Sequence, residues 1–285
     1  MDWLTENKIP IGKWFANLMD FVNAYFYWFF DAIADVLSFL IEGLTDLLLL
    51  VPAPALIGLF ALGAWLLHRS WKLTLGMVLS LLLVVNLDLW QETIQTLTLV
   101  VFSTIVCMAA GVPIGIAAAH RPWLFTIIRP ILDLMQTIPT FVYLIPALIL
   151  FGLGVVPGLV ATAIFAIAAP IRLTHLGVTS VPTPLLEAGE AFGASKSQLL
   201  FKVELPHALP TIMAGLTQCI MLSLSMVVIA ALVGADGLGK PVVRALNTVN
   251  IAKGFEAGLA IVIMAILLDR TCRWPERRSG SGSDR

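Results

Sequence analysis

Long stretches without a charged residue constrain this chain more than any other feature of its sequence. A helix needs about 20 mostly apolar residues to cross the hydrocarbon core of a bilayer, and the longest uncharged stretch runs for 38 residues. Hydrophobic residues make up 59% of the chain and charged residues only 12%, whereas a soluble domain carries roughly 25% charge. The sequence therefore predicts an all-α, polytopic membrane protein. The uncharged stretches are residues 47–67, 73–87, 93–119, 134–171, 205–235 and 257–268.

Turn signals set the number of predicted spans. The longest stretch contains FGLGVVPG at residues 151–158, and glycine with proline at this density indicates a turn between two spans. The last stretch is long enough if its helix begins near Ile251 and accepts Lys253 and Glu256 at its outer end. About seven transmembrane helices result.

The distribution of Lys and Arg orients these spans. When the loops are assigned alternately to two sides, the set that includes the C-terminal tail carries twelve Lys or Arg residues and the other set carries five. Loops rich in Lys and Arg stay in the cytoplasm. We therefore expect a periplasmic N-terminus and a cytoplasmic C-terminus.

The first 46 residues predict a periplasmic or interfacial amphipathic helix. Asp31, Asp35, Glu42 and Asp46 fall on one face at 100° per residue. Nine aromatic residues lie between positions 14 and 30, and such side chains are typical of an anchor at the membrane–water interface. The alternative for these aromatics is a cage for a quaternary ammonium ligand.

One cytoplasmic loop, residues 174–209, predicts structure of its own. Thr183 is an N-cap candidate with Pro184 at the first helical position, and Gly193 stands where a helix would stop. The run from Ser195 to Gln198 predicts a capping box that opens a second short helix, which Leu205-Pro206 ends. Two short helices joined at a glycine would form a stiff elbow, although an ordinary connector is the alternative.

The order of residues in this loop resembles the EAA loop of ATP-binding-cassette (ABC) importer permeases. That motif has Glu-Ala-Ala, three residues, Gly, nine residues and an Ile-x-Leu-Pro end. Here the chain has Glu187-Ala188-Gly189, then Gly193, then residues 203–206 as Val-Glu-Leu-Pro. Gly189 replaces the second alanine, and Val203 replaces the isoleucine.

Further segments are similar to permeases for glycine betaine, proline betaine and choline, which take up quaternary amines for osmoprotection. These segments are residues 133–146, 151–157, 222–230 and 237–239. The resemblance implies a type I ABC importer permease fold in the cell inner membrane. It divides the chain into an N-terminal region (1–46), two first spans (47–92), a permease domain (93–269, with the EAA loop at 183–206) and a cytoplasmic tail (270–285).

The resemblance also implies partners and a mechanism. The permease would form a homodimer on two ABC ATPase subunits, and a periplasmic substrate-binding protein would deliver the substrate for alternating access. The chain would carry no catalytic residue and no cofactor of its own, because no GxxxxGK[ST] phosphate-binding motif occurs; ATP and Mg would bind the partner ATPase. The implied ATPase-coupling residues are Glu187, Ala188, Gly189, Glu190, Ala191, Phe192, Gly193, Leu205 and Pro206.

Polar residues on the fourth predicted span are candidates for the translocation path. Gln136, Thr137, Thr140 and Tyr143 lie beside proline residues that free backbone carbonyls, although polar packing between helices is the alternative. Asp133 is expected to pair with Arg129 at the cytoplasmic boundary. The four histidines fall at cytoplasmic edges without metal-ligand spacing, so no metal site is predicted. The net charge of −1 offers no basic excess for a nucleic acid.

Two other functions stay open at this point. One is a permease of the same architecture for another small solute, such as methionine or a phosphonate. The other is a secondary transporter or channel that acts alone, although neither the inverted repeats nor the buried charge pairs of many such proteins are evident in the sequence. The choice between choline, glycine betaine and proline betaine is also open.

Overall fold

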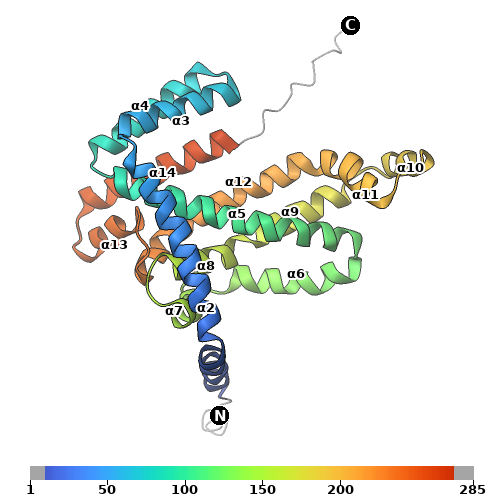
Figure 1. Cartoon of the computed structure of the whole chain (residues 1–285), viewed down its shortest axis with the longest axis horizontal. Coiled ribbons are helices and arrows are strands. Elements are labelled where there is room, and N and C mark those ends of the chain that lie inside the picture. Colours follow the sequence, from blue (N-terminus) through green and yellow to red (C-terminus); the bar gives the residue numbers. More distant parts are fainter. Residues whose placement is uncertain (1–9, 273–285) are drawn as a thin grey trace, which may run out of the picture.

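The computed structural model describes residues 10–272, which form helices and no strand (Figure 1). The predicted all-α class is therefore confirmed. Residues 1–9 of the predicted N-terminal region and residues 273–285 of the predicted tail lie outside the described residues. The helices are α2 (Ile11–Leu50), α3 (Ala53–His68), α4 (Trp71–Asn86), α5 (Trp90–His120), α6 (Pro122–Thr137), α7 (Thr140–Phe151), α8 (Val155–Ala166), α9 (Ala168–Thr179), α10 (Thr183–Ala191), α11 (Lys196–Leu199), η1 (Leu200–Glu204), α12 (Leu205–Ala230), η2 (Ala231–Val233), α13 (Gly239–Asn247) and α14 (Ile251–Cys272).

Four helical segments in the described residues are long and apolar enough to cross a membrane: Trp90–His120, Val155–Thr179, Lys196–Val233 and Ile251–Cys272. Two bent pairs, α2 with α3 and α6 with α7, raise the number to as many as six. The second predicted span corresponds to α4, whose 16 residues are fewer than the roughly 20 that span a bilayer. The predicted turn at residues 151–158 is present, with Gly152 and Gly154 at positive φ.

Two segments differ from the prediction because proline breaks or begins a helix there. The span at residues 47–67 is divided at Val51 and Pro52, where α2 and α3 meet at 104°, since a residue before proline avoids the helical region and Val51 is extended. The charged segment between the uncharged stretches 93–119 and 134–171 is helical rather than a loop, because Pro122 occupies the first turn of α6, where its missing N–H is tolerated. The loop at residues 174–209 also begins later, after Thr179, where α9 ends.

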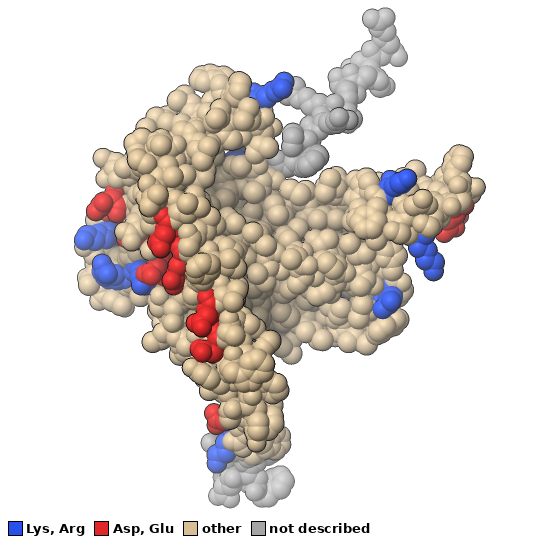
Figure 2. Space-filling view, viewed as in Figure 1, with Lys and Arg blue, Asp and Glu red and all other residues tan. Residues whose placement is uncertain are grey.

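Helix α2 crosses the bundle rather than running along it (Figure 1). It contacts α5, α7 and α8, and the Thr45 hydroxyl lies 2.7 Å from that of Thr98 on α5. Ile41 is buried on the same side, while acidic side chains form an exposed row along the helix (Figure 2). Thus α2 buries one apolar side on the spans and turns its acidic side away.

Close packing of α5, α9 and α12 makes the centre of the bundle. Gly111 and Gly115, four residues apart on α5, face α9 so tightly that a Cβ on either would lie 2.8 Å from Pro170 or 2.7 Å from Thr174. Small residues with this spacing let two helices approach closely in a membrane. Nearer the start of α5, the Ser103 hydroxyl lies 3.2 Å from that of Ser223 on α12. Helices α9 and α12 carry α10 and α11 at one end of the bundle, and α13 follows α12 at the other end (Figure 1).

Candidate functional site

The segment between α9 and α12, residues 182–204, projects beyond the rest of the bundle (Figure 1); we call it the elbow. Its first helix, α10, begins at Thr183, so Pro184 is the second residue of the first turn and not the first helical residue as predicted. The predicted N-cap is wrong. Thr183 is already helical, and the cap position belongs to Pro182, which has no side-chain donor or acceptor to offer. The fixed φ of Pro182 and Pro184 therefore starts this helix without a side-chain cap.

Gly193 ends α10 as predicted. Its φ is +76°, a conformation that glycine adopts without the steric cost of a Cβ. The Gly193 N–H donates to the Glu190 carbonyl at 2.8 Å, and the Ala194 N–H donates to the Gly189 carbonyl at 3.0 Å. These two bonds are the Schellman pattern that closes a helix C-terminus, so backbone hydrogen bonds hold the turn.

The predicted capping box is also present. The Gln198 N–H donates to the Ser195 hydroxyl at 3.3 Å, and the Ser195 N–H donates to the Gln198 side chain at 2.8 Å. The expectation that Leu205-Pro206 ends this helix is wrong, because the chain continues from α11 through the π-helical turn η1 into α12. Proline lacks an N–H and clashes with the preceding helical turn; a wider π turn next to Pro206 accommodates it.

The face of α10 is open to solvent. No residue of the helix is buried, Glu187 and Glu190 are exposed, and the Phe192 side chain is 92% exposed. An exposed aromatic next to small residues and two carboxylates is a surface suited to docking another protein.

Gly189 marks the contact between the two short helices of the elbow. A Cβ at this position would lie 2.6 Å from the end of the Leu199 side chain. The absence of a side chain therefore leaves room for the flexible end of Leu199 against α10. The departure from the Glu-Ala-Ala pattern has a local packing reason that the sequence did not reveal.

A buried carboxylate lies at the base of the elbow, and the sequence reasoning missed it. Glu204 in η1 is only 6% exposed, and its Oε2 lies 2.8 Å from Nε2 of His120 at the end of α5. The other ring nitrogen of His120 lies 3.0 Å from the Ile116 carbonyl oxygen. The sequence feature that could have indicated this buried carboxylate is a glutamate between the apolar residues Val203 and Leu205, at the end of the EAA motif.

The candidate path residues gather at the bend between α6 and α7. Gln136 and Thr137 end α6, Thr140 begins α7, and the two helices meet at 97°. The Tyr143 hydroxyl donates to the Met135 carbonyl at 2.6 Å. In a continuous helix that carbonyl would accept from residue 139, which is a proline without an N–H. Tyr143 therefore supplies the hydrogen bond that Pro139 cannot make.

The expected pairing of Asp133 with Arg129 is wrong. Arg172 on α9 donates to Asp133 at 2.6 Å. The two residues meet because α6, which carries Asp133, packs against α9, which carries Arg172. The sequence showed only which charged residues are neighbours along the chain. The described residues hold no group of three or more His, Cys, Asp or Glu side chains placed to bind a metal ion.

A polar groove lies at the end of the bundle opposite the elbow. It has a volume of about 620 Å³ and includes the α4–α5 turn, α13 and the start of α14. Its walls carry charges of both signs, and Figure 2 shows Lys or Arg beside Asp or Glu over α13. The charged residues that line it are Asp88, Glu92, Arg244, Lys253 and Glu256.

Comparison with known proteins gives one family. Residues 111–278 match the binding-protein-dependent transport system inner membrane component. Over 267 residues the chain is 47% identical to the glycine betaine transport system permease protein OpuAB of Bacillus subtilis (strain 168), a match that covers 92% of this chain and 93% of that protein. It is 42% identical over 285 residues to the glycine betaine/proline betaine transport system permease protein ProW of Escherichia coli (strain K12), which covers 100% of this chain and 80% of that protein.

A solved structure shares the fold. An inward-facing form of the MetNI methionine ABC transporter aligns with a TM-score of 0.56 and 24% sequence identity, over 61% of this chain and 88% of the solved one. At that identity the likeness concerns the arrangement of helices and not the solute that is carried.

Proposed function

The chain belongs to the family of binding-protein-dependent transport system inner membrane components, and from this premise we propose that it is the permease subunit of an ATP-driven importer for quaternary amines. The observation that carries this proposal is the 47% identity to a glycine betaine permease over nearly the whole length of both chains. A relative named for glycine betaine and proline betaine spans the entire chain. These relatives favour quaternary amines over methionine or a phosphonate.

The elbow is the part that we assign to the ATPase subunit. Ala188 and Ala191 allow close approach, Phe192 is free to enter a pocket on the partner, and Glu187 with Glu190 would meet basic groups there. Gly189 and Gly193 shape the elbow, and Leu205-Pro206 joins it to α12. The partner ATPase binds ATP and Mg and supplies the energy.

The elbow is suited to transmit motion because it is stiff and continuous with a span. The capping box, the Schellman turn and the π turn leave no unstructured residue between Ser195 and α12. If the bound ATPase moves the elbow, α12 would therefore tilt. Helices α5 and α9 would tilt with it, since the three helices are packed together. Rigid-body motion of this kind gives alternating access.

The complete importer would contain two permease subunits, with the elbows and the C-terminus in the cytoplasm and the N-terminus in the periplasm. The polar groove at the opposite end of the bundle would then face the substrate-binding protein. Gln136, Thr137 and Thr140 remain candidates for the path, at a bend where irregular backbone is tolerated only beside protein or a water-filled cavity. The Tyr143 hydroxyl at this bend is already bonded to the Met135 carbonyl, so we assign it to packing.

Reconstitution tests the proposal. Proteoliposomes that contain the permease, its ATPase and its binding protein should take up glycine betaine when ATP is supplied, and an excess of methionine should leave this uptake unchanged. Liposomes with the permease alone serve as the control. Uptake by the permease alone under an ion gradient would instead identify a secondary transporter, and inhibition by methionine would identify a different solute.

A further inference from the structure

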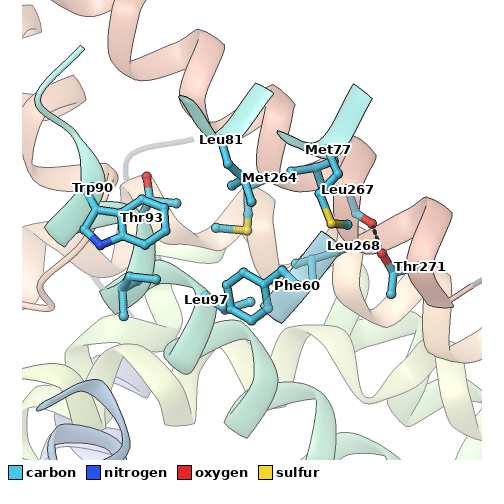
Figure 3. A pocket seen from close by; sticks show the side chains of 11 residues that line it. Phe60, Met77, Leu81, Trp90, Thr93, Leu97, Met264, Leu267, Leu268 and Thr271 are labelled. Carbon is cyan, nitrogen blue, oxygen red and sulfur yellow. Dashed lines mark hydrogen bonds between the residues drawn. The ribbon is translucent and has the colours of Figure 1, made fainter. Parts of the chain in front are cut away.

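A cavity of about 200 Å³ separates the α3–α4 hairpin from the rest of the bundle. Figure 3 shows Phe60 of α3, Met77 and Leu81 of α4, and Met264 of α14 directed toward this space. Trp90 of α5 stands at one end and Thr271 of α14 at the other (Figure 3). The hairpin thus meets the bundle around an elongated, apolar cavity.

The cavity offers almost nothing to a polar occupant. Its two hydroxyl side chains are already bonded within their own helices: Thr93 donates to the Leu89 carbonyl at 2.6 Å, and Thr271 donates to the Leu267 carbonyl at 2.7 Å. Water in a buried cavity needs two to four polar partners. Hydrocarbon is therefore the occupant that these walls favour.

Basic residues gather at the Thr271 end. The His68 ring lies 3.0 Å from the Thr271 carbonyl oxygen, which joins the α3–α4 turn to the end of α14. Arg69 and Lys72 follow His68, and Arg270 precedes Thr271, and all three are exposed. In the part of the chain that the structure describes, no ion pair is formed by these three residues.

We propose that this cavity binds an acyl chain of an anionic phospholipid whose phosphate lies against Arg69, Lys72 and Arg270. The apolar walls suit the acyl chain, and the basic cluster at the Thr271 end suits the headgroup charge. Such a lipid would fill the gap between the hairpin and the bundle, where side chains from α3, α4, α5 and α14 meet without closing the space. The proposal concerns a lipid site and does not depend on the transported solute.

Lipid retention tests this site. The full chain is placed in nanodiscs of phosphatidylcholine with a minor fraction of phosphatidylglycerol, extracted into detergent and examined by native mass spectrometry. We expect about one retained phosphatidylglycerol per chain. Met77→Trp, which fills the cavity, should abolish retention, whereas Leu79→Trp is the matched control, because Leu79 lies on the same helix and is 59% exposed.

A second set of variants tests the contribution of the basic side chains to lipid binding without changing the walls of the cavity. Arg69→Gln, Lys72→Gln and Arg270→Gln should each lower phosphatidylglycerol retention about fivefold, while Lys196→Gln on the elbow should leave it unchanged. Two results would overturn the proposal: equal retention in the Met77→Trp and Leu79→Trp proteins, or equal retention of phosphatidylcholine and phosphatidylglycerol by the wild-type chain.

Discussion

The carboxylate of Glu204 lies 2.8 Å from Nε2 of His120, so the base of the elbow is fastened to the end of α5. The His120 side chain is 45% exposed and the Glu204 side chain 8% exposed. Both ring nitrogens of His120 face oxygen acceptors, Glu204 and the Ile116 carbonyl.

Removal of the imidazole should destabilise the protein. His120→Leu leaves the buried Glu204 carboxylate without its partner, and we expect a loss of about 1–3 kcal/mol in the free energy of unfolding. Thermal unfolding in detergent would show this as a lower midpoint, with His120→Gln, which keeps one donor, between the leucine variant and wild type. A leucine variant as stable as wild type would show that this contact contributes nothing.

Reversal of the elbow charges should impair transport without impairing insertion. Glu187→Lys with Glu190→Lys is expected to lower ATP-dependent uptake about tenfold, the factor that corresponds to ~1.4 kcal/mol of weakened docking. Asp35→Lys, at an exposed acidic position on α2, is the control and should retain uptake. The amount of protein in the membrane fraction is measured alongside, and normal uptake by the double variant would argue against the docking role.

Gly189 and Leu199 should show a coupled effect on α10. A Cβ at position 189 gains about 1 kcal/mol of helix propensity but meets Leu199, and overpacking of this kind costs about 1–3 kcal/mol. Gly189→Ala should therefore lower the protection of α10 amides from hydrogen exchange in the wild-type background. In a Leu199→Ala background the same change should raise protection. Identical effects in the two backgrounds would contradict the contact.

The Tyr143 hydroxyl should contribute to stability rather than to substrate affinity. Tyr143→Phe leaves the Met135 carbonyl without the donor that replaces Pro139, at a cost of about 1–3 kcal/mol. We expect a lower unfolding midpoint and an unchanged half-saturating concentration of glycine betaine for uptake. A raised half-saturating concentration with an unchanged midpoint would instead place this hydroxyl on the path.

The sequence predicted those parts of the fold that depend on local patterns. The stop at Gly193 and the capping box at Ser195 each depend on residues within a few positions of one another, and both are present. Charge partners were not predictable in this way: Asp133 bonds Arg172, 39 positions away, and Glu204 bonds His120, 84 positions away. Such pairs depend on how helices pack, which hydrophobic patterns alone do not specify.

The prolines also show which features a local sequence pattern predicts and which depend on packing. The predicted turn signals located the break between α7 and α8, but proline produced three different outcomes elsewhere. Pro52 separates two helices, Pro122 begins one, and Pro206 follows a π turn inside a continuous helix. Tertiary packing decides which of these outcomes a proline produces, because each needs different partners for the backbone groups that proline leaves free.

Cross-linking at the elbow is the most direct test of the central claim that a separate ATPase subunit binds the elbow. Ala191→Cys places a thiol at an exposed position of α10, and Ser180→Cys, at the exposed residue that follows α9 outside the elbow, is the control. In the purified assembly, a short bifunctional thiol reagent should join position 191 to the ATPase subunit and leave position 180 unlinked. If position 191 never captures the ATPase while the assembly is intact and active, the elbow is not the coupling element.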